Sequence, residues 1–480
     1  MHLVFPNQLF PLAIIKQIPK SEHIVFWEDP IFYGDRKGSA HGPASLKLNK
    51  LRLAYMFVAN RAYVSWLREN GWRHVTHVTV DELWSVPLQS RYEQLSGLHS
   101  KSITYFDPVD HLWSKRTKHA LKHALMDARV LDTPAFVLTT QQAREFARGS
   151  GKGKRMQHAP FYAKVRDFMN VLKGAPSQDG NNRKPYPLNA APPPAPYVAR
   201  TALAADAAAV QWLDAHPIFK SNPGPSDLRA SLTKLPITHA EVRAWLDKFI
   251  KERLRLFGPY EDAIVQGEPW LEHSGLSTYL NMGLITPNEV VRAVVSQKSV
   301  PIESLEGFVR QLLGWREYCR AYYLIVKPSV YTKNTFKLKR RLGKEWYAAN
   351  TGIPIVDDAI RDAFNMGYLH HIRRLMVMSN YMTLSGIAPS EVFKWMYEFS
   401  LDSWDVFMVF NVYSMGTWSD GGHAMRKPYI SSSAYVKRMS RAESGPWEDV
   451  WDAKFKNFLN THANIIKHTQ LAGLLKKNAV

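Results

Sequence analysis

The hydrophobic pattern of the chain changes near residue 236, and this change most constrains the fold. In the first 140 residues, short apolar runs rich in β-branched and aromatic residues alternate with helical spacing. The runs HLVFP, HIVFWE, HVTHVTV, SITYF and AFVLT are predicted strands, and LKLNKLRLAYMFVANRAYVSWL is a predicted helix. Strand–helix–strand repetition is typical of a doubly wound parallel sheet. Beyond residue 236 the spacing is helical almost throughout, which predicts a second, all-α domain.

Three consecutive segments follow from this pattern: an α/β domain (1–143), a long linker (144–235) and an all-α domain (236–480). The linker is expected because ARGSGKGKR is basic and NRKPYPLNAAPPPAPY is rich in proline. Thr238 and Glu241 form a predicted capping box for a helix ending at Gly258-Pro259, and Thr286 caps the next helix. The first predicted strand is not followed by G-x-G-x-x-G, so the usual dinucleotide fingerprint is missing.

The chain is strongly basic, with 62 Lys and Arg against 42 Asp and Glu and a formal net charge of +20. This balance favours a polyanionic partner, nucleic acid ahead of an acidic membrane, over a basic enzyme without such a partner. The 480 residues include no apolar run long enough to span a bilayer and no signal peptide, so a cytoplasmic protein is expected. The single cysteine, Cys319, excludes an intramolecular disulfide and a four-cysteine cluster.

Two stretches carry polar residues that could do chemistry. GPYEDAIVQGEPWLEHSGLSTYLN places Gly, Ser, Thr and His between two capped helices, which suits a phosphate group as well as an ordinary interhelical loop. GYLHHIRRLM (367–376) has the apolar spacing of a buried helix, yet it contains His370, His371, Arg373 and Arg374. Taken alone, paired histidines are core or surface residues, and a metal site is less favoured because H-E-x-x-H is missing.

Together with GWREYCR, these stretches resemble the photolyase/cryptochrome flavoproteins. Within that superfamily they are most similar to the bacterial (6-4) photolyase group that normally carries an iron–sulfur cluster. NRKPYP, the DGG at 420–422 and KPYISSSAYVKRMS fit the same group. The resemblance implies an α/β antenna-type domain followed by an all-α FAD-binding domain. The residues that match flavin-binding positions are Tyr260, His273, Ser274, Leu276, Ser277, Arg316, Glu317, Arg374, Asp402 and Asn411.

The implied function is light-driven repair of UV pyrimidine photoproducts in DNA, the reaction of a DNA photolyase, a carbon–carbon lyase. Excited reduced FAD would pass one electron to a lesion extruded from the stack. Cyclobutane-dimer enzymes carry a carboxylate where this chain has Leu312, with Gln311 beside it. (6-4) enzymes carry paired histidines, matched by His370 and His371. His371 is the expected proton donor and His370 its orienting partner. A cyclobutane-dimer or dual-lesion photolyase and a cryptochrome-type blue-light sensor stay open as alternatives.

The resemblance implies further roles. Tyr429 and Tyr435 match lesion-pocket tyrosines, and Trp346 and Trp395 match electron-relay tryptophans. The next position of the relay is Met396 instead of an aromatic residue, and Tyr397 could take its place. We expect an Arg374–Asp402 ion pair beside the flavin, because a buried charge needs a partner, and Arg373 facing outward or toward a phosphate. Expected contacts to DNA phosphates come from Lys152, Lys154, Arg155 and Lys437.

The sequence departs from the group at the iron–sulfur ligands, because WYAANTGIPIVDD and RMSRAESGPWEDVWDAKFKNFL contain no cysteine. We therefore predict no cluster and no other metal, with four residues packing in its place: Pro354, Ile355, Trp447 and Trp451. A ribolumazine antenna would lie at the strand ends near Phe5, Asn7, Gln8 and Glu28, a loose match that leaves an empty site or another antenna open. A monomer is expected, with UV-damaged DNA as its partner, nucleoid-associated during repair and with no membrane contact.

Overall fold

The computed structural model describes residues 1–39, 42–91, 102–123, 127–151, 155–198 and 200–477. The chain divides into two compact units. The first, here the sheet unit, comprises Met1–Thr139, Tyr197–Leu246 and Leu276–Val290. The second, here the helical unit, comprises Thr140–Pro196, Asp247–Gly275 and Val291–Val480. The segment expected as a linker therefore contributes to both units instead of standing between two consecutive domains.

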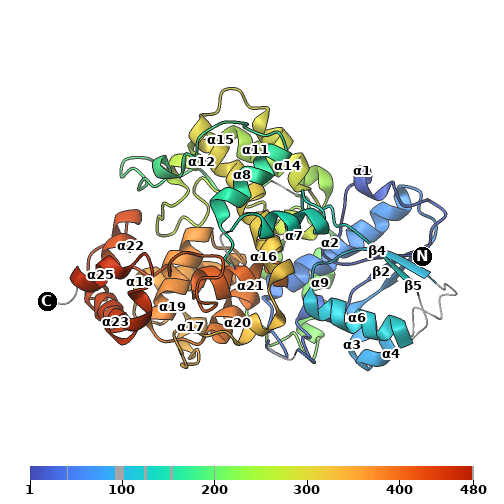
Figure 1. Ribbon diagram of the computed structural model, residues 1–480. Coiled ribbons are helices and arrows are strands. Elements are labelled where there is room, and N and C mark those ends of the chain that lie inside the picture. The colour runs from blue at the N-terminus through green and yellow to red at the C-terminus, as the bar shows by residue number, and fades with distance from the viewer. Residues whose placement is uncertain (40–41, 92–101, 124–126, 152–154, 199, 478–480) are drawn as a thin grey trace. The chain divides into compact units, whose positions relative to one another are not determined.

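The sheet unit is built on a parallel sheet in the order β3-β2-β1-β4-β5 over the described residues. Its strands are β1 (His2–Val4), β2 (Ile24–Trp27), β3 (Val75–Val78), β4 (Ser102–Phe106) and β5 (Asp127–Leu131). Helix α2 (Lys50–Glu69) lies on one face and α6 (His111–His123) on the other (Figure 1). The sheet is therefore doubly wound, as predicted.

Four of the five predicted strands are confirmed, and the fifth is wrong. AFVLT at 135–139 forms turns, although Phe136 and Leu138 are buried. The strand is instead β5, with the sequence DARVL, which pairs only with β4 at the edge of the sheet. An edge strand with mostly exposed side chains does not require the apolar run that identifies a buried strand.

The remaining helices of the sheet unit are short apart from α9. They are α1 (Leu12–Ile15), η1 (Pro30–Tyr33), α3 (Val80–Trp84), α4 (Leu88–Arg91), α9 (Ala204–Ala215), α10 (Leu228–Leu232) and α13 (Ser277–Met282). Helices α11 (His239–Glu252) and α14 (Pro287–Val295) each contribute residues to both units.

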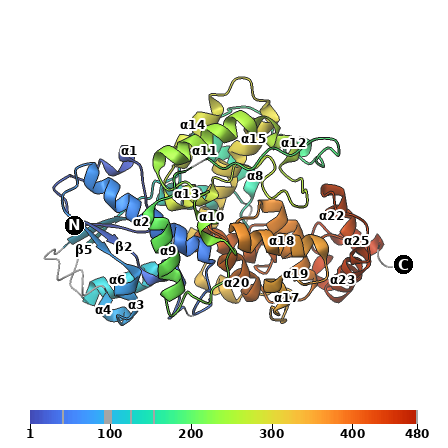
Figure 2. The same ribbon diagram turned by 180° about the vertical axis from the view of Figure 1, so that it is seen from behind.

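The helical unit contains the other elements (Figure 2). They are α7 (Thr140–Arg148), α8 (His158–Phe168), η2 (Asp179–Asn181), α12 (Leu254–Tyr260), α15 (Ile302–Val309), η3 (Arg310–Arg316), α16 (Glu317–Ile325), η4 (Pro328–Thr332), α17 (Glu345–Ala348), α18 (Pro354–Met366), η5 (Arg373–Ser379), α19 (Asn380–Leu384), α20 (Pro389–Phe399), α21 (Asp405–Val409), η6 (Phe410–Gly416), α22 (Ser433–Met439), α23 (Trp447–Thr461), α24 (Ala463–Ile466) and α25 (Ala472–Lys477). Among the described residues no helix is long and apolar enough to cross a bilayer.

The predicted helix starts are confirmed. The Thr238 amide donates to Glu241 Oε2 at 3.0 Å and the Glu241 amide to Thr238 Oγ1 at 3.3 Å, a complete capping box. Thr286 Oγ1 accepts from the Glu289 amide at 3.2 Å in the same way. The predicted stop at Gly258-Pro259 is wrong, because the first helix ends at Glu252 and this dipeptide lies inside α12.

The stretch 367–376 is not one helix. Helix α18 ends at Met366 and is capped by Gly367, which has the left-handed φ of 61°. A Cβ at this position would lie 1.6 Å from Leu401 Cδ1, so the turn needs glycine. Tyr368 to His370 are non-helical and the helix resumes at His371. His370 therefore precedes a helix start and His371 is the first residue of the helix that follows.

Candidate functional site

A cavity of about 320 Å³ opens within the helical unit. Half of the residues in its wall come from three π-helical segments: η3 supplies Arg310, Gln311 and Trp315, η5 supplies Arg374, Leu375, Met376 and Ser379, and η6 supplies Asn411, Val412 and Met415. The other lining residues are Arg183, Glu261, Asp262, His371, Ile372, Met396, Met408, Lys427, Tyr429 and Tyr435. The π-helical turn is rare and is frequent at functional sites, so three of them around one cavity mark it as the candidate site.

The cavity brings together several residues that the sequence nominated. They are His371, Tyr429, Tyr435 and Gln311 from the predicted lesion site, and Arg374 and Asn411 from the predicted flavin site. The π-helical turns, the carboxylates Glu261 and Asp262 and the cations Arg183 and Lys427 were not expected. The adjacent acidic residues in GPYEDAIV, Glu261 and Asp262, could have indicated these two carboxylates from the sequence.

The predicted ion pair between Arg374 and Asp402 is present and bidentate. Arg374 Nη1 lies 2.9 Å from Asp402 Oδ1, and Nη2 lies 3.0 Å from Oδ2. Arg374 Nε also donates to the Leu369 carbonyl at 2.6 Å. Two parallel N–H···O bonds fix the guanidinium plane, so this cation has one orientation at the cavity wall.

The expected orientation of Arg373 is wrong. Its side chain is buried and pairs with Asp358 at 2.8 Å and with Asp362 at 2.5 Å. The two carboxylates lie four residues apart on α18, hence on one face of that helix. Because η5 packs against α18, Arg373 lies between them, where it is buried and does not line the cavity.

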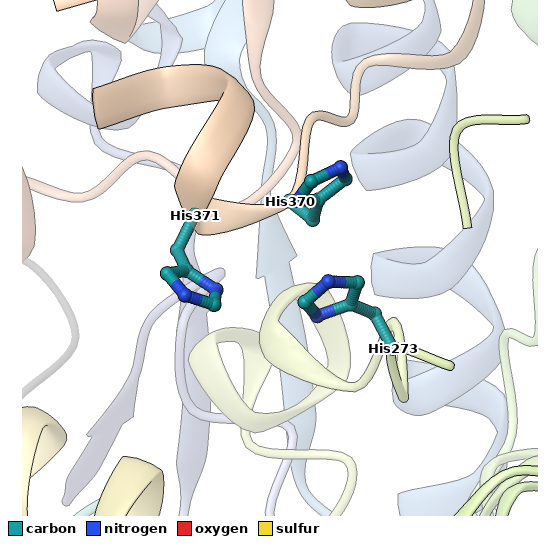
Figure 3. A group of neighbouring side chains, drawn as sticks. All are labelled: His273, His370 and His371. Atoms are coloured by element: carbon teal, nitrogen blue, oxygen red, sulfur yellow. The ribbon is translucent and has the colours of Figure 1, made fainter. Parts of the chain in front are cut away.

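Three histidines form a cluster beside the cavity (Figure 3). His273 and His370 stack with ring centroids 4.4 Å apart and planes 14° apart, and His371 meets His273 edge-on at 5.4 Å. Burial is the first cause that lowers the pKa of His273 and of His370 well below the usual range, so both rings are neutral. Both nitrogens of His370 and Nε2 of His273 have no hydrogen-bond partner among the described residues.

These three rings suit a metal in type but not in direction. One nitrogen from each lies within 4.8 Å of the others. An imidazole binds a metal along the lone pair in its ring plane, and the stacked rings of His273 and His370 keep their lone pairs in two separate, nearly parallel planes. One ring would have to turn before they could share an ion.

His371 is held by a carboxylate and not by His370. Its Nε2 lies 3.2 Å from Asp262 Oδ1, whereas the His370 and His371 rings stand 6.3 Å apart without a hydrogen bond. The hydrogen-bond partner of His371 is therefore Asp262, and the expected orienting role of His370 stays a prediction that this geometry does not favour. His371 also lines the cavity, whereas His370 is buried behind it.

The rest of the wall combines amide, phenol and aromatic groups. Gln311 Nε2 donates to Glu261 Oε2 at 3.2 Å. Burial raises the pKa of Tyr435 to about 12, and the negative charge of Asp262 contributes, so this phenol stays protonated near neutral pH. Trp315 stacks on His158 with 3.7 Å between ring centroids, which fixes the indole at the cavity wall.

The wall fits a planar heterocycle with polar edges. The sulfur-containing side chains of Met396, Met408 and Met415 supply an adaptable apolar surface, and Arg374 and Asn411 supply hydrogen-bonding groups. FAD is such a ligand, and the unpartnered nitrogens of the adjacent histidine cluster are further groups that a bound phosphate could satisfy.

The other predicted flavin residues lie outside the cavity wall. Tyr260, His273, Ser274, Arg316, Glu317 and Asp402 belong to the helical unit, while Leu276 and Ser277 belong to the sheet unit at the start of α13. Burial lowers the pKa of Arg316 to about 10, and the neighbouring Glu317 opposes this shift. Arg316 therefore stays a buried cation.

The predicted electron-relay residues are buried. Trp395 Nε1 donates to the Trp346 carbonyl at 2.9 Å, and Tyr397 packs against Phe393 with centroids 5.6 Å apart. Met396, and neither tryptophan, lines the cavity. These contacts leave the relay role a prediction.

The region where the cluster ligands were sought is filled by aromatic residues. Trp447 and Trp451 meet at 6.2 Å, as predicted, and Trp451 also meets Tyr381 at 4.8 Å. Ile355 is buried, but Pro354 is exposed at the start of α18, so its expected packing role is wrong. Proline is favoured at a first helical position because its missing N–H needs no partner there.

The predicted DNA contacts are only partly described. Lys152 and Lys154 lie outside the described residues, and Arg155 is exposed. Lys437 is near Glu448, with 3.2 Å between Nζ and Oε2, which offsets its charge. Arg183 and Lys427 are the cations at the cavity wall besides the arginines of η3 and η5.

The four residues expected near an antenna make contacts within the sheet unit. Gln8 Nε2 donates to the Phe106 carbonyl at 2.7 Å, and Asn7 Nδ2 to the Pro108 carbonyl at 3.1 Å. Glu28 is buried among Asn60, His77 and the Val80 amide. Burial opposes ionisation of Glu28, but the hydrogen bonds from His77 and Asn60 and the charges of His77 and Arg61 together outweigh it, so its pKa is lowered. Phe5 packs at 4.8 Å from Trp113.

Comparisons with known proteins find similarity over parts of the chain. The family model described as deoxyribodipyrimidine photo-lyase-related protein matches residues 2–228. A (6-4) photolyase of Agrobacterium fabrum (strain C58) is 35% identical over 207 residues, which cover 42% of this chain and 41% of that protein. The match thus spans about two fifths of that relative. An uncharacterised protein of Acanthamoeba polyphaga mimivirus is 43% identical over 112 residues, covering 22% of this chain and 85% of that protein.

Two solved structures share the fold over nearly the whole chain. A bacterial class III photolyase from Agrobacterium tumefaciens superposes with a TM-score of 0.62 at 16% identity, covering 97% of each chain. A cryptochrome from Synechocystis sp. PCC6803 gives 0.60 at 15% identity, covering 100% of this chain and 94% of the other. At these identities the likeness concerns the fold alone.

Proposed function

We infer that the chain belongs to the photolyase/cryptochrome superfamily, and from this premise we propose that it is a light-driven DNA photolyase acting on (6-4) photoproducts. The observation that carries the proposal is the cavity of the helical unit, where His371, Tyr429 and Tyr435 share a wall with Arg374 and Asn411. The histidine and the two tyrosines suit a damaged base, and Arg374 and Asn411 suit a flavin.

FAD is the proposed cofactor, with an antenna pigment in the sheet unit as a further possibility of the family. When bound and reduced, FAD supplies one electron to the lesion on excitation by blue or near-ultraviolet light. Asn411 and Arg374 line the cavity and would hold the flavin ring, with Asp402 fixing the Arg374 guanidinium. Trp395 and Trp346 are proposed to feed electrons inward.

The chain's own residues bind and protonate the lesion. His371 donates a proton to the hydroxyl group on the damaged base, since an imidazole exchanges protons near neutral pH. Tyr429 and Tyr435 hydrogen-bond the base edge, and the indole of Trp315 offers a stacking surface. Arg183 and Lys427 attract the flanking phosphates. The lesion pairs weakly, which lowers the cost of moving it out of the stack.

A cyclobutane-dimer photolyase is the second candidate, and the position of Glu261 at the cavity wall favours it. Its carboxylate lines the cavity and accepts from Gln311. Cyclobutane-dimer enzymes have a carboxylate near the lesion. Leu312 does not supply one in this chain, whereas Glu261 could.

The test is a lesion-selective repair assay. The purified, flavin-reduced chain is incubated with oligonucleotides that carry one (6-4) photoproduct or one cyclobutane dimer, in blue light and in darkness, and restored bases are counted. Light-dependent restoration of the (6-4) lesion alone supports the proposal. Restoration of the dimer alone moves the assignment to the second candidate, and no restoration of either lesion leaves a light sensor as the better reading.

A further inference from the structure

We propose that Asp262 is the positioning residue for His371. Its carboxylate holds the Nε2–H of the imidazole and leaves Nδ1 as the nitrogen that exchanges a proton with the lesion. This inference rests on the proposed repair function. It assigns a role to a carboxylate that the sequence motifs did not single out.

The contact joins two segments far apart in the sequence. Asp262 follows the end of α12, and His371 is the first residue of its helix. His371 Nε2 and Asp262 Oδ1 are 3.2 Å apart, and both side chains line the same cavity. The Asp262 side chain is 15% exposed and that of His371 is 42% exposed. A group that is half in solvent turns freely about its side-chain bonds unless a partner fixes it, and Asp262 is that partner.

The two neighbouring histidines do not hold His371 in this way. His273 presents its ring edge-on at 5.4 Å and His370 at 6.3 Å. Both are neutral because burial lowers their pKa well below the usual range. Among the described residues, Asp262 is the group hydrogen-bonded to His371.

The bond determines which nitrogen reacts. A carboxylate accepts from Nε2–H in both the neutral and the protonated imidazole, so Nδ1 carries the exchangeable proton. In the forward step the Nδ1–H bond of the imidazolium breaks and the proton goes to the hydroxyl oxygen of the damaged base. The neutral ring keeps its Nε2–H on Asp262, and the Nδ1 lone pair takes the proton back after the electron leaves the repaired bases. Asp262 stays ionised, and the proton count is unchanged over the cycle.

Asp262 acts on a second group of the same wall. Its charge contributes to raising the pKa of Tyr435 to about 12, after burial as the main cause. The phenol therefore stays a hydrogen-bond donor while His371 cycles.

The experiment compares Asp262→Ala, Asp262→Asn and His371→Ala with the native chain, all loaded with FAD. Repair of a (6-4) oligonucleotide gives kcat and KM, and ¹⁵N NMR of histidine-labelled protein reports the tautomer of His371, assigned by its loss in His371→Ala. We expect the Nε2–H tautomer in the native chain and a tautomer mixture in Asp262→Ala. The kcat of Asp262→Ala should fall ~10–100-fold, by analogy with the loss seen when a group that orients a metal-binding histidine is removed.

The asparagine variant separates positioning from charge. Its amide oxygen still accepts from Nε2–H, so the tautomer should stay fixed and kcat should lie between those of the native and alanine chains. DNA affinity should not weaken in either variant, because each removes a negative charge from a phosphate-binding wall. Asp449→Asn, at an exposed position on α23, removes the same charge elsewhere and should leave kcat unchanged. If Asp262→Ala does not fold, the kcat of Asp262→Asn and the tautomer of His371 in that variant provide the test.

Three results would overturn the inference: native kcat in Asp262→Ala, an unchanged tautomer in that variant, or a loss confined to KM. The proposed function fails separately, if His371→Ala repairs as well as the native chain. Because the inference requires His371 to act, the double variant Asp262→Ala/His371→Ala should be no slower than His371→Ala alone.

Discussion

Replacing Arg373 by leucine should destabilise the helical unit strongly. The guanidinium is buried between Asp358 at 2.8 Å and Asp362 at 2.5 Å, so the substitution leaves two largely buried carboxylates without their cation. Breaking a buried ion pair in this way costs about 3–5 kcal/mol. At roughly 2 °C per kcal/mol for a unit of this size, the thermal midpoint should fall by about 6–10 °C.

The stability lost in Arg373→Leu should depend on pH, and the pKa of Asp362 determines the direction of that dependence. Burial already raises the pKa of this carboxyl, and Arg373 opposes the rise. Without Arg373 the folded-state pKa rises further above the unfolded value. A carboxyl with a raised pKa favours the folded state below its unfolded pKa and loses that contribution as pH rises through the folded pKa. The difference in thermal midpoint between the variant and the native chain should therefore be smaller at pH 5 than at pH 8.

The assay is differential scanning calorimetry of both chains at the two pH values. Arg361→Leu is the matched control, because Arg361 is 53% exposed and reaches Asp358 only at 3.9 Å. An exposed pair of this kind contributes about 0–1 kcal/mol. A midpoint shift for Arg373→Leu no larger than that of the control, or an equal shift at pH 5 and pH 8, would refute the reasoning.

Three further predictions concern the cavity. Asp402→Asn leaves Arg374 without its charged partner and should release flavin more readily, seen as a lower flavin-to-protein absorbance ratio after gel filtration; an unchanged ratio would place the pair away from the flavin. Lys427→Ala should weaken binding to damaged DNA and reduce the slope of log K against log salt by about 1, whereas an unchanged slope would remove this lysine from the phosphate contacts. Trp395→Phe should slow light-driven flavin reduction in the presence of a thiol while flavin stays bound, and native kinetics would exclude Trp395 from the relay.

Much of the fold could be predicted because local patterns and the final structure agree. Apolar runs identified β1 to β4, and the capping residues Thr238 and Thr286 marked two helix starts. β5 could not be found in this way, since an edge strand such as DARVL lacks the apolar signal. The end of α18 was missed because a glycine within an apolar periodic pattern does not by itself reveal a left-handed turn.

The site was harder to predict because its contacts cross the sequence. The pairing of Arg374 with Asp402 could be expected from the need of a buried charge for a partner. Arg373 was misplaced because its partners lie on α18, and sequence spacing does not show how η5 packs on that helix. Asp262 was overlooked since 109 positions separate it from His371.

The most direct test of the account is the light-driven repair yield of a (6-4) oligonucleotide by FAD-loaded native protein and by His371→Ala, with flavin content measured in both. The account predicts repair by the native chain and a loss of about 10²–10⁴-fold in the variant at equal flavin occupancy, the usual contribution of a proton-donating side chain. Equal repair by both chains would contradict it, because the histidine at the cavity wall would then have no part in the chemistry.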